Sequence, residues 1–238
     1  MQLTQIKQIT STLVLKTGLH IGGGDTEMRI GGIDNQVVKN PVSGLPYIPG
    51  SSLKGKIRSL LEWKHGLVSL ENNGKPFSFQ QLKDSEIDAA AGNLLRLFGG
   101  APDKNLDDKI KKIGTTRLLF WDCALNAEWK KSVLDERNLL VTEAKSENSI
   151  NRISGVADNP RFTERVIAGA GFDFRLTLKV HDDEDLLDMV LTGLKLLEYD
   201  SLGGSGSRGY GKIEFRDLRV DDVLVQDFER LRPFNRVA

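Results

Sequence analysis

The chain has 238 residues, of which 39% are hydrophobic and 24 are glycine, and its 33 basic side chains balance 33 acidic ones to a formal net charge of zero. This length and composition exclude a disordered chain and predict one large globular domain. Because the net charge is zero, any nucleic-acid partner must be held by a local basic patch or by a surface that several subunits build together.

The cysteine count and the hydropathy pattern exclude further classes of protein. Cys123 is the single cysteine, which excludes an internal disulfide and cysteine-based zinc or iron–sulfur sites. No apolar run approaches the roughly 20 residues that cross a bilayer, and residues 1–10 lack the apolar core of a secretion signal. We therefore expect a soluble, cytoplasmic protein with no membrane partner.

The first predicted element is a strand over residues 6–21, where apolar residues mostly alternate with threonine and other polar residues. Residues 22–50 follow, a stretch rich in glycine and proline that is too long for an ordinary loop unless it is functional. Apolar residues at helical spacing then predict a helix over about 52–65, with Ser51 and Ser52 as candidate N-caps.

Two segments are predicted to lie outside the core. Residues 67–113 form a helical insertion, in which the helix from Ile87 to Phe98 ends at a pair of glycines. The segment over about 140–170 is polar, contains several turn residues and has few apolar residues to anchor it. Its composition predicts an extended hairpin or arm that projects from the body.

The core is completed by strands over 115–125 and 171–180, a helix after His181, and closing strands. Without the insertions, the order is strand, helix, strand, strand, helix, strand. This order predicts an α+β, ferredoxin-like fold, in which a four-stranded antiparallel sheet carries both helices on one face. The predicted core covers, within a single domain, residues 1–66, 114–126 and 171–238.

Gly204, Gly206 and Gly209 satisfy the spacing of the dinucleotide-binding fingerprint, but they follow a predicted helix and open a strand. The fingerprint needs the opposite order, because the pyrophosphate binds at the N-terminus of the helix that the glycines introduce. Two interpretations remain open. The loop is either a flexible connection or a backbone surface that a polyanion approaches closely, with Arg208 supplying charge.

Residues 50–56 differ by one position from a phosphate-binding loop, since Ile57 stands where the loop needs the serine or threonine that binds magnesium. The segment is also predicted to be helical, so we do not expect ATP hydrolysis. A helix N-terminus with free amide donors, two serine hydroxyls, and Lys54 and Arg58 one turn apart suits a bound phosphate. The alternative is a capped surface helix with solvated charges.

Few side chains are candidates for catalysis. The histidines, His20, His65 and His181, have neither metal-ligand spacing nor a nucleophile beside them, although His20 adjoins the glycine-rich stretch. Asp34 lies in the sequence Gly-Gly-Ile-Asp, where the glycines permit close approach of a ligand. Because an aspartate in a turn most often bonds to its own backbone, a structural and a catalytic role both stay open for Asp34.

Residues 19–62, 147–174 and 202–215 carry the glycine-rich stretch, the arm and the terminal glycine loop. Together and in this order, these segments resemble the RAMP superfamily, specifically the Csm-type backbone subunit of type III-A CRISPR interference complexes. The resemblance implies a ferredoxin-like, RRM-related core with a projecting thumb hairpin. It also implies copies of the chain stacked head to tail along a CRISPR guide RNA, with other subunits of the type III-A complex as partners.

The same resemblance implies an activity and the residues that support it. Target RNA would pair with the guide and be cut at regular intervals by a metal-dependent endoribonuclease, with Asp34 as its essential aspartate. Asp34 would either ligate a divalent cation, for which Mg²⁺ is expected, or help to deprotonate the attacking 2′-hydroxyl; no other metal ligand is identified. The implied RNA contacts are His20, Ser51, Ser52, Lys54, Arg58, Arg152, Arg161, Arg165, Gly204, Gly206 and Arg208.

Two other functions stay open beside the endoribonuclease. One is a structural subunit that binds guide RNA in the filament without cutting target RNA. The other is a guide-processing ribonuclease of the same superfamily, which acts alone on a precursor hairpin and usually relies on a histidine. Cleavage of complementary RNA by the assembled complex would distinguish the endoribonuclease from the structural subunit. Cleavage of precursor RNA by the isolated chain would favour the guide-processing ribonuclease.

Overall fold

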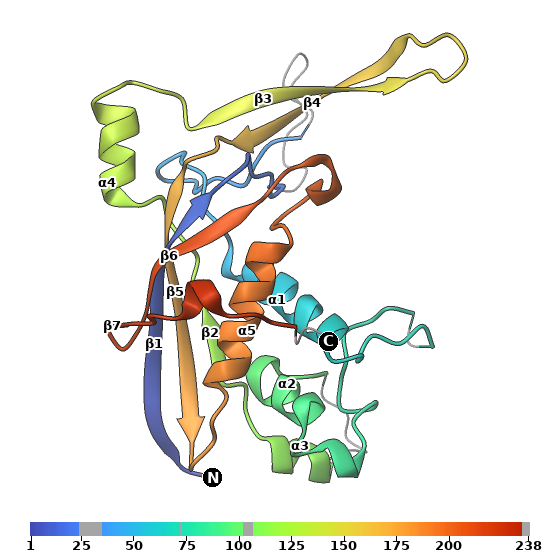
Figure 1. Cartoon of the computed structure of the whole chain (residues 1–238), viewed down its shortest axis with the longest axis vertical. Coiled ribbons are helices and arrows are strands. Elements are labelled where there is room, and N and C mark those ends of the chain that lie inside the picture. Colours follow the sequence, from blue (N-terminus) through green and yellow to red (C-terminus); the bar gives the residue numbers. More distant parts are fainter. Residues whose placement is uncertain (24–34, 72, 102–106, 235–238) are drawn as a thin grey trace.

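The computed structural model of the chain describes residues 1–23, 35–71, 73–101 and 107–234 (Figure 1). Within these residues, the main sheet has the strand order β2-β5-β1-β6-β7. Its strands are β1 (Leu3–Leu15), β2 (Leu118–Phe120), β5 (Gly171–His181), β6 (Ile213–Val220) and β7 (Val223–Leu224). β1 pairs antiparallel with both β5 and β6, and β2 pairs antiparallel with β5. The predicted mixed fold with an antiparallel sheet is confirmed.

The alternation in β5 decides which face of the sheet forms the core. Phe172 and Phe174 are buried, whereas Asp173 and Arg175 between them point to the opposite face. In the register of the sheet, Leu13 of β1 lies opposite Phe172, so apolar residues of neighbouring strands meet on the same face.

Helices α1 (Gly50–Lys64) and α5 (Leu187–Tyr199) pack against each other on one face of the sheet (Figure 1). Their apolar residues recur at helical spacing, which directs them to the core. The buried residues of this spacing are Leu53, Ile57, Leu61, Val190, Leu194 and Leu197. Gly193 lets the two helices approach, because a Cβ atom there would lie 2.7 Å from Cγ2 of Ile57.

The insertion contains η1 (Asp84–Glu86), α2 (Ala90–Phe98) and α3 (Asp107–Ile113), so the helix predicted from Ile87 begins at Ala90. Arg117, just before β2, connects the sheet to the loop before α5. Its fully buried guanidinium donates to the carboxylate of Glu184 at 2.6 and 3.0 Å. A buried guanidinium needs such a partner, and this ion pair joins the start of β2 to the loop before α5.

The segment predicted to form an arm folds into β3 (Thr142–Ile150) and β4 (Ala157–Val166), a hairpin that extends from one end of the main sheet (Figure 1). We call it the thumb hairpin. At its tip, the backbone N–H of Asn151 donates to the carbonyl of Val156 at 2.9 Å. Most of its residues are exposed, so the hairpin has almost no core of its own and depends on contacts near its base.

Shorter elements complete the described chain: α4 (Ala127–Lys130), η3 (Lys131–Asp135), η4 (Gly206–Arg208) and η5 (Phe228–Arg230). None of the described helices is long and apolar enough to cross a membrane. Cys123, which follows β2, is fully buried, and burial raises the pKa of its thiol to about 12. The thiol is therefore protonated and shielded from solvent.

The first strand is shorter than predicted, since β1 ends at Leu15 rather than at residue 21. Leu19 exchanges backbone hydrogen bonds of 3.0 and 2.8 Å with Val166 of β4 instead of continuing the main sheet. The chain thus leaves the sheet to meet the thumb hairpin, and His20 lies at the base of the hairpin, beyond the end of β1. The strand predicted over 115–125 is likewise reduced to β2.

The prediction that Ser51 or Ser52 caps the first helix is wrong. Helix α1 begins at Gly50, and the N–H of Gly50 donates to Oδ1 of Asp122 at 2.7 Å. The capping carboxylate therefore comes from the far side of the insertion. A Cβ atom at position 50 would lie 2.9 Å from the carbonyl oxygen of Phe120, so glycine allows the helix to start against the end of β2.

Candidate nucleic-acid interface

Glu164 of β4 is the residue around which three distant segments meet. Its carbonyl oxygen lies 2.7 Å from Nδ1 of His20, and its backbone N–H donates to the carbonyl of Asn35 at 2.9 Å. Its carboxylate accepts from the N–H of Val37 at 3.0 Å and from Nζ of Lys39 at 2.6 Å. The residue is only 4% exposed. The middle of the glycine-rich stretch, residues 35–39, is therefore attached to the base of the thumb hairpin.

The hydrogen bonds to Glu164 keep its side chain charged. Burial raises the pKa of this carboxyl, but hydrogen bonds from Lys39, from the N–H of Val37 and from Thr142, together with the charge of Lys39, lower it below its usual range. Asp34, the predicted catalytic residue, lies outside the described residues. Its neighbour Asn35 is described and pairs with Thr163, the residue before Glu164.

His20 joins the base of the thumb hairpin to the terminal glycine loop. The N–H of Gly204 donates to the carbonyl of His20 at 2.9 Å. A Cβ atom at Gly203, where φ is +75°, would lie 2.3 Å from the same carbonyl oxygen. Because a carbonyl only accepts, Nδ1 of His20 carries the proton that it shares with the carbonyl oxygen of Glu164. The structure thus brings together His20 and Gly204, two of the residues that the resemblance implies as RNA contacts.

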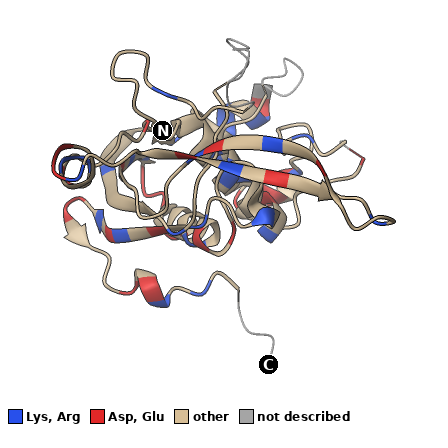
Figure 2. Cartoon of the chain, turned by 90° about the horizontal axis from the view of Figure 1, so that it is seen from above, with Lys and Arg blue, Asp and Glu red and all other residues tan. Residues whose placement is uncertain are grey.

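A second cluster lies where β3 passes the glycine loop. The hydroxyl of Tyr210 donates to Oε1 of Glu147 at 2.9 Å, and Nη1 of Arg208 donates to Oε2 of Glu147 at 2.6 Å. Nζ of Lys145 and Cζ of Arg165 lie 4.5 and 5.1 Å from the centroid of the Tyr210 ring. Both signs of charge therefore alternate along the thumb hairpin (Figure 2).

The thumb arginines differ in how they are paired. Nε of Arg165 donates to Oε1 of Glu143 at 2.7 Å, and its side chain packs over Gly18. Arg161, on the exposed part of β4, and Arg152, at the hairpin tip, make no ion pair with another residue that the structure describes. The two outer arginines are therefore more accessible to an external phosphate than Arg165.

The start of α1 presents fewer free groups than its sequence predicts. Ser51 is exposed and Lys54 is half-buried. The guanidinium of Arg58 is 16% exposed; its Nε donates to Glu62 at 2.8 Å, and it also donates to the carbonyl of Phe77. Arg58 thus points into the protein, where its bonds to Glu62 and Phe77 connect α1 to the insertion.

Internal packing accounts for some glycines of the terminal loop. A Cβ atom at Gly206 would lie 2.0 Å from Oγ of Ser201, and one at Gly211 would lie 1.9 Å from the carbonyl oxygen of Leu202. At Gly204, which is exposed, the nearest atom would be 3.7 Å away. Gly204, like the exposed Gly209, which has no atom within 4 Å of an added Cβ, therefore leaves backbone open to a ligand.

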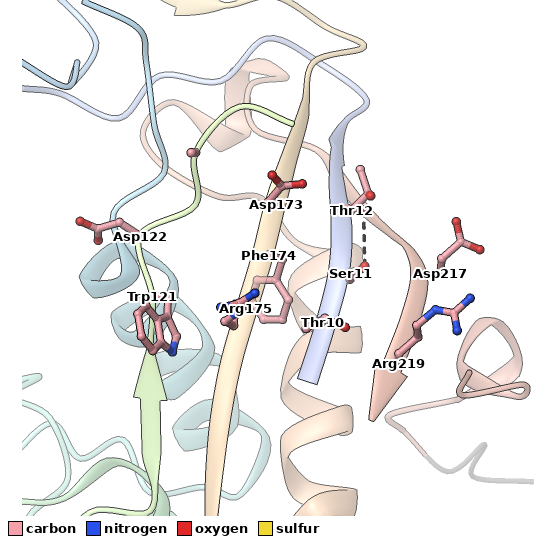
Figure 3. A pocket seen from close by; sticks show the side chains of 11 residues that line it. Thr10, Ser11, Thr12, Trp121, Asp122, Asp173, Phe174, Arg175, Asp217 and Arg219 are labelled. Carbon is pink, nitrogen blue, oxygen red and sulfur yellow. Dashed lines mark hydrogen bonds between the residues drawn. The ribbon is translucent and has the colours of Figure 1, made fainter. Parts of the chain in front are cut away.

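A shallow cavity of about 460 Å³ lies on the sheet face opposite α1 and α5 (Figure 3). It contains none of the predicted site residues. Its lining combines both signs of charge, and Cζ of Arg175 lies 5.8 Å from the centroid of the Trp121 ring. The charged residues of the lining are Asp122, Asp173, Arg175, Asp217 and Arg219. Among the described residues, no group of three or more side chains could hold a metal ion.

Glu164, Glu147 and Tyr210 make the contacts that join the thumb hairpin to the body. None of the three was predicted from the sequence. Glu164 has one detectable signal, since it alternates with Val166 in a strand and therefore occupies an inward position of the pattern. Glu147 and Tyr210 carry no comparable signal, because their contact joins residues far apart in the chain.

The comparisons with known proteins agree on a family. The sequence model of the RAMP superfamily matches residues 12–214. "CRISPR system Cms endoribonuclease Csm3" of Methanothermobacter thermautotrophicus is 39% identical over 243 residues, covering 97% of this chain and 96% of the relative. The protein of the same name from Streptococcus thermophilus is 42% identical over 222 residues, covering 91% and 90%.

Solved structures give the same result. The structure described as the Csm3-Csm4 subcomplex in the type III-A CRISPR-Cas interference complex matches with a TM-score of 0.56 and 28% identity, covering 96% of this chain and 85% of that one. The Methanopyrus kandleri Csm3 crystal structure matches with a TM-score of 0.54 over 90% of this chain and 75% of that one; at 24% identity this likeness shows the fold. The chain therefore belongs to the RAMP superfamily, and within it to the Csm3 family.

Proposed function

We propose that this chain is the backbone subunit of a type III CRISPR effector complex, in which it binds the guide RNA and cleaves complementary target RNA at regular intervals. One observation carries this proposal: relatives named as the endoribonuclease Csm3, from separate organisms, are about 40% identical to it over nearly its whole length. Their shared name favours the cleaving subunit over a purely structural one.

The proposed scaffold is the ferredoxin-like unit. The strand order β2-β5-β1-β6, with antiparallel pairing throughout, supports it, as do two helices on one face of the sheet. In this scaffold the start of α1, the glycine loop and the thumb hairpin carry the proposed guide contacts. Arg58 is excluded from them because its guanidinium is paired internally.

The proposed guide surface is a strip rather than a basic face. Backbone N–H groups and the half-buried His20 would contact RNA near Gly204, and Lys54, Arg152 and Arg161 would neutralise phosphates. A narrow strip suits a chain whose net charge is zero. Base pairing between guide and target would supply sequence specificity, so the protein needs to recognise only the RNA backbone.

The proposed chemistry uses Asp34 beside a distorted RNA linkage. Asn35, the residue that follows Asp34 in the chain, pairs with Thr163 at the base of the thumb hairpin. A displaced nucleotide can bring its 2′-hydroxyl in line with the adjacent phosphate, which regular A-form geometry disfavours. Asp34 would either hold a Mg²⁺ ion shared with RNA phosphates or help to remove the 2′-hydroxyl proton.

The proposed partners are the guide RNA, the target RNA, further copies of this chain stacked head to tail, and other subunits of the type III-A complex. The match to a structure described as a Csm3-Csm4 subcomplex supports a second type of subunit. Alternating charges along the thumb hairpin suit contact between neighbouring copies, because acidic and basic groups of adjacent subunits can pair (Figure 2).

The test is Asp34→Ala in the purified complex, with labelled complementary RNA and Mg²⁺. Guide content and target affinity should stay unchanged, while the cleavage rate should fall by at least about 100-fold, the usual effect of losing a catalytic acid or base. Asp25→Ala, which changes another acid of the same glycine-rich stretch, is the matched control and should cut normally. Normal cutting by the Asp34 variant removes this residue from the mechanism, and chelation with EDTA tests the need for the metal ion.

A further inference from the structure

Within the described residues, contacts between the thumb hairpin and the body gather at two places. At its base, Leu19 exchanges backbone hydrogen bonds with Val166, and Glu164 accepts from Val37 and Lys39. The second place lies partway along β3, where Glu147 meets the glycine loop. A two-stranded hairpin without a core bends easily, so its direction is set by where it is attached. With the base attachment alone, the hairpin could pivot about its base. The second attachment, at Glu147, fixes its direction relative to the body.

The second attachment has the character of a fixed contact. Tyr210 is 1% exposed, and its hydroxyl donates to Glu147, whose side chain is 18% exposed. Nη1 of Arg208 donates to Oε2 of Glu147, and Nζ of Lys145 lies 3.4 Å from Oε1, the oxygen that accepts from Tyr210. A hydrogen bond to a charged acceptor, shielded from water, is among the stronger ones in proteins.

The loop that presents Tyr210 is itself hydrogen-bonded to the body. Gly209 and Gly211 on either side of Tyr210 adopt φ values of +84° and +69°. The N–H of Gly211 donates to the carbonyl of Gly18 at 2.9 Å, and its Cα packs against the carbonyl of Leu202. The phenol is thus held by the same part of the body that carries His20, so its bond to Glu147 transmits the position of that segment to the thumb hairpin.

We infer that Tyr210 and Glu147 are positioning residues for target-RNA cleavage, acting as a latch that sets the direction of the thumb hairpin. This inference rests on the proposed function, since it assigns a role within that reaction. Neither residue touches the reacting atoms. The latch decides how far the hairpin displaces the RNA, and an error of about 1 Å in such a placement costs roughly 100-fold in rate. Binding of the guide depends on many contacts and is much less sensitive.

The first experiment compares Tyr210→Phe with Tyr199→Phe in the assembled complex. Both variants lose one hydroxyl and keep the ring, but Tyr199 is 54% exposed and lies outside the latch. At saturating target, Tyr210→Phe should lower the single-turnover cleavage rate about tenfold, as expected for a partial misplacement. Guide content and the Kd for target should stay within about twofold of wild type, the scale of a contact that carries little binding energy. Tyr199→Phe should match wild type in all three measurements.

The second experiment tests whether the two residues act as one unit. Glu147→Ala should slow cleavage about as much as Tyr210→Phe, and Glu147→Gln, which still accepts from the phenol, should recover part of the rate. The double variant Tyr210→Phe/Glu147→Ala should be no slower than either single one, because a latch is lost only once. The cleavage rates of wild type, Tyr210→Phe, Glu147→Ala and the double variant together measure the coupling between the two residues.

Three results would overturn the latch: a normal rate for Tyr210→Phe, single effects that multiply in the double variant, or a loss of guide that parallels the loss of cleavage. They differ from a failure of the proposed function itself. In that case the wild-type complex would not cut complementary RNA, and the positioning role would fall with the reaction it serves.

Discussion

The start of α1 and the terminal glycine loop were both predicted to contact RNA, but their arginines differ in how exposed they are. Arg58 of α1 is 16% exposed and is engaged by Glu62 and the carbonyl of Phe77. Arg208 beside the thumb hairpin is also paired, with Glu147 at 2.6 Å, yet it remains 58% exposed. The same residue type at a favourable spacing is thus internal in one region and accessible in the other.

From this difference we expect the exposure of a cation, more than its pairing, to decide whether it can bind RNA. An exposed ion pair contributes about 0–1 kcal/mol, so a phosphate can replace its carboxylate at little cost. A buried pair cannot exchange partners in this way, because the group left behind would be buried and unpaired. The following variants test the contrast between internal and accessible groups.

Glu164→Ala should have the largest effect on stability, because Glu164 joins three segments at the base of the thumb hairpin. The variant leaves the N–H of Val37 without its acceptor and Lys39 without its partner. We expect a loss of about 3 kcal/mol in the free energy of unfolding, within the range for breaking a buried charged contact. Urea denaturation measures it, and a loss below about 1 kcal/mol would show that the three segments hold without this carboxylate.

The pH dependence of stability sharpens the same prediction. The folded state holds the pKa of Glu164 below its usual range, so the unfolded chain binds more protons as the pH falls. Its contribution is full above the ordinary glutamate pKa and is lost as the pH falls through the lowered folded value. The difference in unfolding free energy between wild type and Glu164→Gln should therefore shrink from pH 7 to about pH 3. A constant difference would contradict this role.

Arg58→Ala should cost about 2 kcal/mol of stability, since Glu62 loses a charged partner in a buried setting. Lys54→Ala, on the same helix, is the matched variant. It should change stability by less than about 0.5 kcal/mol but weaken guide binding about threefold, with a salt dependence reduced by about one phosphate contact. Thermal unfolding and guide titrations at several salt concentrations measure the two effects. If Lys54→Ala lowered stability and Arg58→Ala weakened guide binding, Lys54 would be the internal cation and Arg58 the accessible one.

Gly206→Ala and Gly204→Ala give the smallest contrast. Alanine at 206 would press on Oγ of Ser201, which should cost about 1 kcal/mol through local repacking. Alanine at 204 meets no atom closer than 3.7 Å, so stability should be retained while close approach of the RNA backbone is hindered. Equal stability losses would mean that both glycines serve only the fold.

The sequence predicted those elements whose patterns are local. Alternation in residues 171–180 identified β5, helical spacing identified α1 and α5, and polar turn residues identified the thumb hairpin. Local patterns failed where a distant group takes over: Asp122 caps α1 in place of Ser51 or Ser52. Leu19 similarly leaves the predicted first strand because Val166 supplies its hydrogen bonds.

The sequence did not predict the contacts that join the candidate site residues. His20 and Gly204, which are far apart in the chain, share a backbone hydrogen bond. The internal partner of Arg58 was not predictable, because spacing along a helix shows which face a residue occupies but not which carboxylate it will pair with. Glu164 shows the same limit, since its alternation with Val166 indicates an inward position but not its partners Val37 and Lys39, which come from a distant segment.

The shielding of Cys123 makes the chain convenient for probe chemistry. A protonated thiol with a pKa of about 12 and no exposed surface reacts poorly with maleimides, so the natural residue can stay in place. A cysteine introduced at Ser154, at the exposed tip of the thumb hairpin, would be the one that takes up a fluorophore or nitroxide. Its mobility would then report the swing of the hairpin directly, before and after RNA is added.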